Sequence, residues 1–196
     1  MDALAAAWAA TSSWEVVAMG LGVAYIALAT RESAWCWVAG FASTAIYVRL
    51  FWDASLLMES ALQVFYLVMS VVGFWRWRAG GEDGQAPIVR WSPRQHGLAL
   101  GAIAVATVLS GFVLSRTTSA ALPYADSFTT WASVVTTVMV AQKVLGNWVY
   151  WIVINIVGIY LYATRGLVLT CALYAVYEVM AVVGLVQWTR SYRKQA

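Results

Sequence analysis

Seven long apolar stretches constrain the fold of this chain more than any other feature of its sequence. They cover residues 14–30, 34–51, 54–75, 97–115, 126–145, 147–163 and 166–188. A helix needs roughly 17–25 predominantly apolar residues to cross the core of a bilayer. The stretches do not alternate with the period of two that a membrane β-barrel requires. The sequence therefore predicts an all-α integral membrane protein with seven transmembrane helices.

The composition agrees with this fold class and bears on function. Charged residues make up only 11% of the 196 residues, whereas soluble domains carry about 25%. The two cysteines lie apart in apolar stretches, and we expect free buried thiols. The only histidine, His96, lies in a polar linker, where we expect it to be solvated. We therefore expect no metal site, no cofactor and no catalytic residue.

Retinal photoreceptors also have seven membrane helices, and the sequence excludes this class of protein. A retinal protein needs a lysine in its last helix to form a Schiff base. Residues 166–188 contain no lysine. The sequence therefore does not predict a retinal protein.

The distribution of positive charge predicts the orientation in the membrane, because lysine and arginine accumulate on the cytoplasmic side. With the N-terminus outside, the inner loops and tail contain nine of the 12 basic residues. Only Arg49, Arg116 and Arg165 lie outside. We therefore expect an outer N-terminus and a cytoplasmic C-terminus.

An internal repeat relates the third and seventh stretches. Residues 61–77 (ALQVFYLVMSVVGFWRW) and 172–188 (ALYAVYEVMAVVGLVQW) agree without a gap at about half of their positions. Both segments end in tryptophan close to basic residues, so both run in the same direction across the membrane. Two three-helix units are parallel only if an odd number of spans separates them. The repeat therefore predicts a 3+1+3 arrangement, an architecture found in transporters whose site lies near the midplane.

This arrangement divides the chain into four parts. We expect an N-terminal arm at 1–13, a first three-helix repeat at 14–78, a cytoplasmic linker with linker helix four at 79–125, and a second repeat with a basic tail at 126–196.

Polar and aromatic residues share helical faces in four of the spans. The third span carries Glu59, Gln63, Tyr66, Ser70, Gly73 and Trp77, the seventh carries Thr170, Tyr174, Tyr177, Ala181, Gly184 and Trp188, the sixth carries Trp148, Trp151, Asn155, Gly158 and Tyr162, and the second carries Trp37, Gly40, Thr44 and Tyr47. Polar groups in a membrane face a bundle interior or a wet cavity. Amides beside aromatic rings suit a flat, hydrogen-bonding heterocycle, and aromatic faces attract organic cations. The alternative is that Gln63 and Asn155 only join helices by hydrogen bonds.

The chain resembles the Pnu vitamin transporters, whose best-known branch is the PnuC nicotinamide riboside transporters. The resemblance rests on the two repeat segments, on GNWVYWIVINIVGIYLY (146–162) and on WEVVAMGLGVAYIALATRESAWCWVAGF (14–41). Its most specific element is Asn147, Trp148 and Trp151, followed by Asn155. The resemblance implies a homotrimer in the bacterial inner membrane that moves its vitamin by facilitated diffusion. A cytoplasmic kinase then traps the vitamin by phosphorylation.

The resemblance also implies a substrate site at Gln63, Trp148, Trp151 and Asn155, with Tyr66 and Trp37 as further contacts. Glu59 adds negative charge, or is solvated at the outer end of its helix, and Glu178 lies off the stripe of the seventh span. We rank nicotinamide riboside first as substrate. Thiamine is the alternative because it is also a cationic ring, and riboflavin fits less well because it is neutral and larger. A third alternative is a structural membrane subunit that transports nothing.

Overall fold

The structure is a computed structural model that describes residues 11–53, 57–79, 86–118, 122–164 and 166–195, without the side chains of 57–59 and 61. The described residues form seven α-helices: α2 (Ser13–Thr30), α3 (Trp35–Asp53), α4 (Leu57–Ala79), α5 (Pro93–Thr117), α6 (Pro123–Ala141), α7 (Asn147–Thr164) and α8 (Val168–Gln195). Most of the N-terminal arm expected at 1–13 lies outside the described residues.

Local capping signals account for where several of the helices begin. The Ser12 hydroxyl accepts a hydrogen bond from the backbone N–H of Glu15 and caps α2. Ser92 and Gln95 form a reciprocal capping box at the start of α5, with Pro93 in the first turn. Such caps satisfy N–H groups that have no partner within the helix. As a result α5 begins before residue 97, where the apolar stretch starts.

The end of α6 differs from the predicted span 126–145. The helix ends at Ala141, because Lys143 adopts a left-handed conformation with φ of 51°. Val144 and Leu145 are nevertheless buried. The linker covers this loop, since Leu145 N–H donates to the Val89 carbonyl and Val89 N–H donates to the Lys143 carbonyl. The apolar stretch is therefore longer than the helix because it continues into a buried loop.

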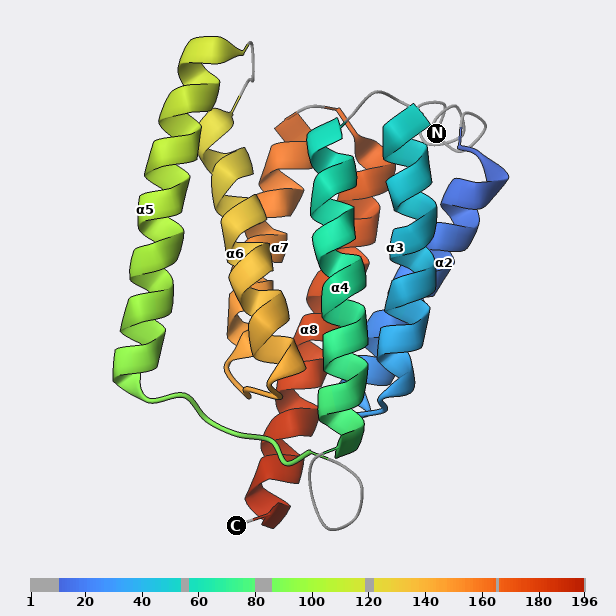
Figure 1. The fold of residues 1–196 in the computed structure, drawn as a ribbon, viewed down its shortest axis with the longest axis vertical. Coiled ribbons are helices and arrows are strands. Elements are labelled where there is room, and N and C mark those ends of the chain that lie inside the picture. The colour runs from blue at the N-terminus through green and yellow to red at the C-terminus, as the bar shows by residue number, and fades with distance from the viewer. Residues whose placement is uncertain (1–10, 54–56, 80–85, 119–121, 165, 196) are drawn as a thin grey trace.

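Helices that follow each other in the sequence mostly pack against each other. Helix α3 packs on α2 and α4, and α7 packs on α6 and α8. Two further contacts, α2 with α8 and α4 with α6, join these groups. Helix α5 packs mainly on α6, and it stands at the edge of the bundle (Figure 1).

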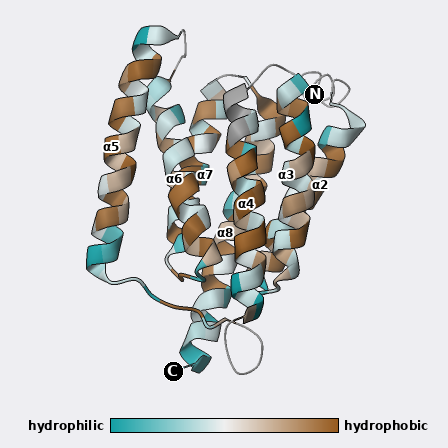
Figure 2. Ribbon diagram, in the orientation of Figure 1, coloured by the Kyte–Doolittle hydropathy of each residue, from teal (hydrophilic) through white to brown (hydrophobic). Residues whose placement is uncertain are grey.

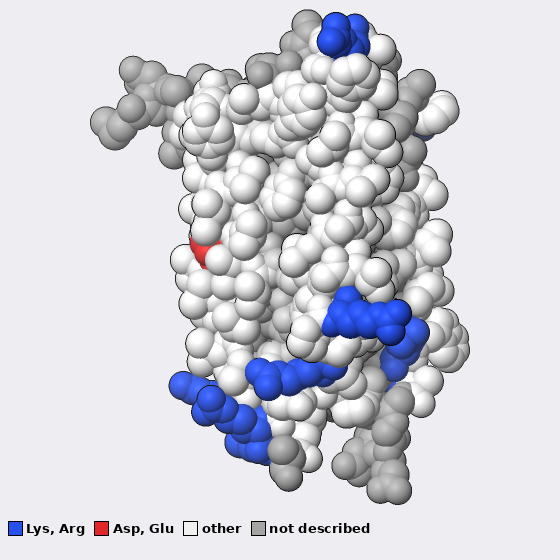
Figure 3. All heavy atoms as spheres, turned by 90° about the vertical axis from the view of Figure 1, so that its left-hand side faces the viewer, with Lys and Arg blue, Asp and Glu red and all other residues white. Residues whose placement is uncertain are grey.

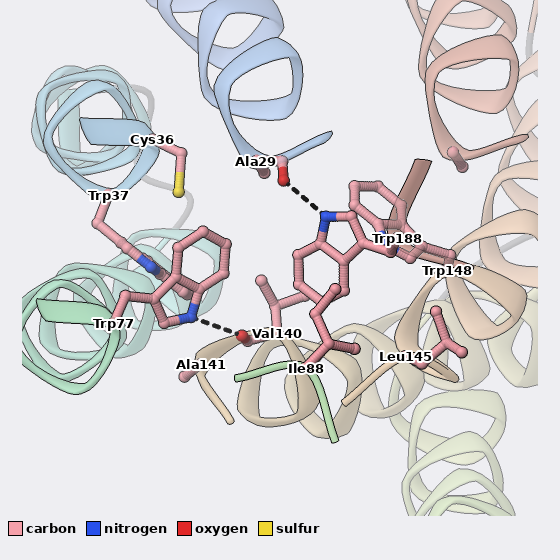
Figure 4. Packing of buried hydrophobic residues seen from close by; sticks show 11 residues of the cluster. Ala29, Cys36, Trp37, Trp77, Ile88, Val140, Ala141, Leu145, Trp148 and Trp188 are labelled. Atoms are coloured by element: carbon pink, nitrogen blue, oxygen red, sulfur yellow. Dashed lines mark hydrogen bonds between the residues drawn. The ribbon is translucent and has the colours of Figure 1, made fainter. Parts of the chain in front are cut away.

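The contacts made by α4 recur in α8 at a constant spacing of 111 residues, the spacing that separates Glu32 from Lys143. Trp37 packs on Gly73 as Trp148 packs on Gly184, so that a Cβ on either glycine would overlap an indole ring. The Trp77 indole N–H donates to the Val140 carbonyl at 3.0 Å. The Trp188 indole N–H donates to the Ala29 carbonyl at 2.9 Å (Figure 4). The segments at 61–77 and 172–188 therefore make equivalent contacts.

The surface of the bundle is that of a membrane protein. Four of the described helices, α2, α5, α7 and α8, are long and apolar enough to cross a bilayer. Apolar residues extend along the helices, and hydrophilic residues gather toward their ends (Figure 2). Lysine and arginine lie mainly toward one end of the face shown in Figure 3. We call this end, where α4 and α8 finish, the basic end.

Candidate functional site

Two of the predicted site residues, Trp37 and Trp148, lie in a tryptophan cluster that also contains Trp77 and Trp188. The ring centroids of Trp37 and Trp77 are 5.7 Å apart, those of Trp77 and Trp188 are 5.7 Å apart, and those of Trp188 and Trp148 are 5.4 Å apart. All four side chains are buried. They form a continuous series of rings from α3 through α4 and α8 to α7 (Figure 4).

The indole N–H groups of the tryptophan cluster differ in their partners. Those of Trp77 and Trp188 donate to backbone carbonyls. Those of Trp37 and Trp148 have no partner among the described residues, although both are buried. Because a buried N–H without a partner is costly, these two equivalent positions are candidates to donate to a ligand.

Asn155 lies deeper in α7, and its side chain is only 4% exposed. It lies beside the carboxylate of Glu178 in α8, whose Oε2 is buried without a hydrogen-bond partner among the described residues. Trp151, one turn before Asn155, is half-buried and packs against the hydrophobic core that contains these tryptophans. The structure therefore places an amide and a carboxylate side by side between α7 and α8, with an aromatic residue one turn away on α7.

A group of tyrosines lies farther from the basic end. Tyr66 of α4 lies against Ser133 of α6. Tyr177 of α8 is the equivalent of Tyr66 at the spacing of 111 residues. Its hydroxyl lies close to Gly22 of α2, since a Cβ added to that glycine would be 3.0 Å from it. The ring centroids of Tyr162 and Tyr174 are 4.9 Å apart, and those of Tyr174 and Tyr177 are 5.8 Å apart. The sequence places Tyr162, Tyr174 and Tyr177 on polar stripes, but none of these three is a predicted site residue.

The remaining predicted site residues, Gln63 and Glu59, both belong to α4. Gln63 is half-buried in α4, one turn before Tyr66. The backbone of Glu59 belongs to α4, and its side chain lies outside the described residues.

The structure corrects the expectation for His96. It lies in the first turn of α5 and is half-buried, with Nδ1 3.1 Å from the Tyr150 hydroxyl. It lines a cavity of about 210 Å³ at the basic end. The cavity lining is Arg90, Trp91, His96, Leu145, Gly146, Val149, Leu185 and Thr189, none of which is a predicted site residue.

An ion pair joins two loops at the basic end. Lys143 Nζ lies 3.3 Å from Glu32 Oε2, and the lysine side chain is 1% exposed. The ammonium also lies 4.9 Å from the centroid of the Trp77 ring, a favourable cation–π geometry. Burial lowers the pKa of Lys143, although the Glu32 carboxylate acts in the opposite direction. In the sequence, Lys143 is predicted only to be one of the basic residues on the inner side of the membrane.

Metal binding finds no support in the residues that the structure describes. They contain no group of three or more histidine, cysteine, aspartate or glutamate side chains placed to hold an ion. Cys36 is free and buried, as expected, whereas Cys171 is free and only half-buried.

A family model described as "Nicotinamide mononucleotide transporter" matches residues 12–190. The chain belongs to this family. The resemblance to Pnu transporters predicted from the sequence is thereby confirmed, and this member of the family is an integral membrane protein that crosses the bilayer several times.

Relatives of this family member are named as transporters, in agreement with the expectation that it is not an enzyme. It is 22% identical to the nicotinamide riboside transporter PnuC of Escherichia coli, over 93% of its own length and 88% of the relative's. It is 23% identical to the riboflavin/roseoflavin transporter RibM of Streptomyces davaonensis, over 90% and 84% of the two chains.

The fold of this family member also matches a solved structure. A crystal structure of the vitamin B3 transporter PnuC superposes with a TM-score of 0.73 at 24% identity. The match covers 92% of this chain and 82% of the other.

Proposed function

We propose that this protein carries nicotinamide riboside across the membrane by facilitated diffusion. The substrate lies between two parallel three-helix repeats, α2–α4 and α6–α8, which α5 joins in a 3+1+3 arrangement with seven membrane spans. We propose the domain boundaries that the sequence predicts, with an arm at 1–13, repeats at 14–78 and 126–196, and the linker with its helix at 79–125. The relative named as a nicotinamide riboside transporter supports this choice of substrate.

One observation carries the proposal: buried polar groups lack partners on α3, α7 and α8, and two of them lie in the tryptophan cluster that spans both repeats. The indole N–H groups of Trp37 and Trp148 and the Glu178 Oε2 have no partner in the described part of the chain. Structural packing alone leaves few buried polar groups unpaired. A ligand with ribose hydroxyls and a carboxamide supplies acceptors for the indoles and a donor for the carboxylate.

The charge of the proposed site favours a cationic ring. Nicotinamide riboside carries a positive pyridinium, which the Glu178 carboxylate attracts and which the faces of Trp151 and the tyrosines stabilise. Asn155, held beside Glu178, then hydrogen-bonds the carboxamide. Gln63 and Tyr66 approach from the first repeat, and Glu59 adds negative charge on the same stripe.

Thiamine is the second candidate, because its ring is also cationic and its aminopyrimidine is a donor that Glu178 can accept from. Riboflavin, the substrate in the name of the RibM relative, is neutral and leaves the carboxylate without a partner of opposite charge.

We further propose that the protein lies in the bacterial inner membrane as a homotrimer. Its N-terminus is outside, because nine of the 12 basic residues then face the cytoplasm. The two repeats rock about the midplane site, and a cytoplasmic kinase traps the vitamin by phosphorylation.

Calorimetric titration of the purified protein with nicotinamide riboside, thiamine and riboflavin tests the proposal. We expect nicotinamide riboside to bind most tightly, and proteoliposomes to take it up saturably without ATP or an ion gradient. Tighter binding of thiamine would select the second candidate. If no vitamin bound, the structural-subunit alternative would replace transport.

A further inference from the structure

The Glu32–Lys143 pair joins two equivalent positions of the repeat. Among the described residues, Glu32 and Lys143 are the non-glycine residues with positive φ, at 58° and 51°. Each follows the last turn of the first helix in its repeat, and the backbone hydrogen bonds match. Glu32 N–H donates to Ala29 and Lys143 N–H donates to Val140. Equivalent positions of two copies meet only near the axis that relates them, so the pair lies where the two repeats face each other.

Two hydrogen bonds flank this pair and also connect the repeats. The Trp188 indole donates to Ala29 at the end of α2, and the Trp77 indole donates to Val140 at the end of α6. Each repeat therefore caps the first helix of the other. Together with the 3.3 Å ion pair, these are three polar contacts between the repeats within a small region of the basic end.

Because the ion pair is buried, separating the two loops that carry it costs free energy. Lys143 is 1% exposed and contacts the Trp77 ring. Removing Glu32 leaves a buried ammonium without its counter-ion, and removing Lys143 leaves a partly buried carboxylate. Separation of these two loops would break the ion pair and hydrate both charges.

We propose that the Glu32–Lys143 pair is the gate of the basic end: it holds the two repeats together there, and the carrier opens at this end only when the pair breaks. The gating role of the pair rests on the proposed transport function. The closed basic end is nevertheless a property of the protein without ligand and can be tested without transport. The gate belongs to the chain's own equivalent loops and involves no predicted substrate residue.

Cys36 provides a native reporter for this gate. Its thiol is 0% exposed, and it belongs to the same buried cluster as Trp37 and Trp77. In a Cys171→Ser background it is the only thiol in the chain. Lys143 lies near this thiol and Glu32 carries the opposite charge, so removing either charge has opposite direct effects on its reactivity. A rate of modification by N-ethylmaleimide that rises on removal of each charge therefore reports how often the basic end opens to water.

The experiment compares this rate in purified full-length protein without substrate. Lys143→Met and Glu32→Gln each remove one charge, and we expect each to raise the rate by about tenfold or more. Arg31→Met is the matched control, because Arg31 is an exposed neighbour in the same loop. We expect it to leave the rate within about twofold of the parent, as for surface substitutions in general.

The charge-swapped double variant Glu32→Lys/Lys143→Glu separates gating from folding. It restores opposite charges and places the ammonium near Trp188, the equivalent of Trp77. We expect modification close to the parent rate. Single variants with the parent's rate would overturn the gate, and so would a double variant as fast as the single ones. If the single variants fail to purify, the double variant decides alone. Vitamin binding is measured separately, so failure of the transport proposal leaves this result readable.

Discussion

The indole of Trp188 donates a 2.9 Å hydrogen bond to the carbonyl oxygen of Ala29, across 159 residues of sequence. Helix α8 thus caps the end of α2. The equivalent bond from Trp77 to Val140 caps the end of α6. Both bonds lie beside the Glu32–Lys143 pair, and substitution of either tryptophan tests them.

Trp188→Phe and Trp77→Phe should destabilise the protein to a similar degree. Each removes one of the hydrogen bonds that a buried carbonyl accepts, while the backbone N–H of Glu32 or Lys143 still donates to it. The loss of one such bond costs about 0.5–1.5 kcal/mol. Thermal unfolding in detergent measures the change. The matched control is Trp75→Phe, since Trp75 is 66% exposed on the same helix as Trp77. An equal loss in the control would show that the hydrogen bonds contribute little.

Gly73→Ala and Gly184→Ala should each destabilise the bundle, because the added Cβ overlaps the indole of Trp37 or Trp148. Overpacking of this kind costs about 1–3 kcal/mol. Gly101→Ala in α5 is the control, since a Cβ there meets nothing within 4 Å. Alanine is the better helix former by about 1 kcal/mol, so the control should be neutral or more stable. Unfolding midpoints that fall in all three variants would contradict the packing described for the two glycines.

Asn155→Leu and Trp151→Ala should each abolish vitamin binding in calorimetry, while the variants still purify as folded protein. Val153→Leu serves as the control because Val153 is exposed between them on α7. Should Asn155→Leu fail to fold, Asn155 would instead have the structural role of joining α7 to α8.

Glu178→Gln should weaken the binding of cationic vitamins by about tenfold, because it removes a carboxylate from a partly desolvated site. Neutral riboflavin should lose no affinity. Glu15→Gln at the start of α2 controls for the change in net charge. Equal losses for cationic and neutral ligands would show that Glu178 acts through the position of Asn155 and not through its charge.

The two ends of α5 test the orientation. Arg94→Cys and Arg116→Cys place thiols at its first and last turns, at opposite ends of the bundle. In intact cells, we expect a membrane-impermeant maleimide to modify the cysteine at 116 and to reach the cysteine at 94 only after permeabilisation. The reverse pattern would place the N-terminus in the cytoplasm.

The helices of this protein were predictable because a bilayer demands long apolar stretches, and α2 follows the predicted span 14–30 closely. The end of α6 was not predictable in this way. Val144 and Leu145 are apolar because they are buried under the linker and not because they lie in a membrane span. Hydropathy does not distinguish lipid contact from such burial.

The candidate site was predictable only in part. Helical spacing placed Trp148, Trp151 and Asn155 on one face, but it does not identify the neighbour that this face meets. The packing of Trp148 on Gly184 and the approach of Asn155 to Glu178 depend on how α7 and α8 are rotated. The ion pair between Glu32 and Lys143 had one signal in the sequence, since the spacing of the repeat aligns these opposite charges.

That alignment has a consequence for how the two halves recognise each other. Two identical copies of the first half would bring Glu32 against a second Glu32, and two copies of the second would bring Lys143 against a second Lys143. Like charges repel in both cases, and only the mixed pairing brings opposite charges together. If the two halves were made as separate polypeptides, we would expect each half to bind the other half more tightly than a second copy of itself. The difference at this one loop position therefore favours the pairing of unlike halves over the pairing of like halves.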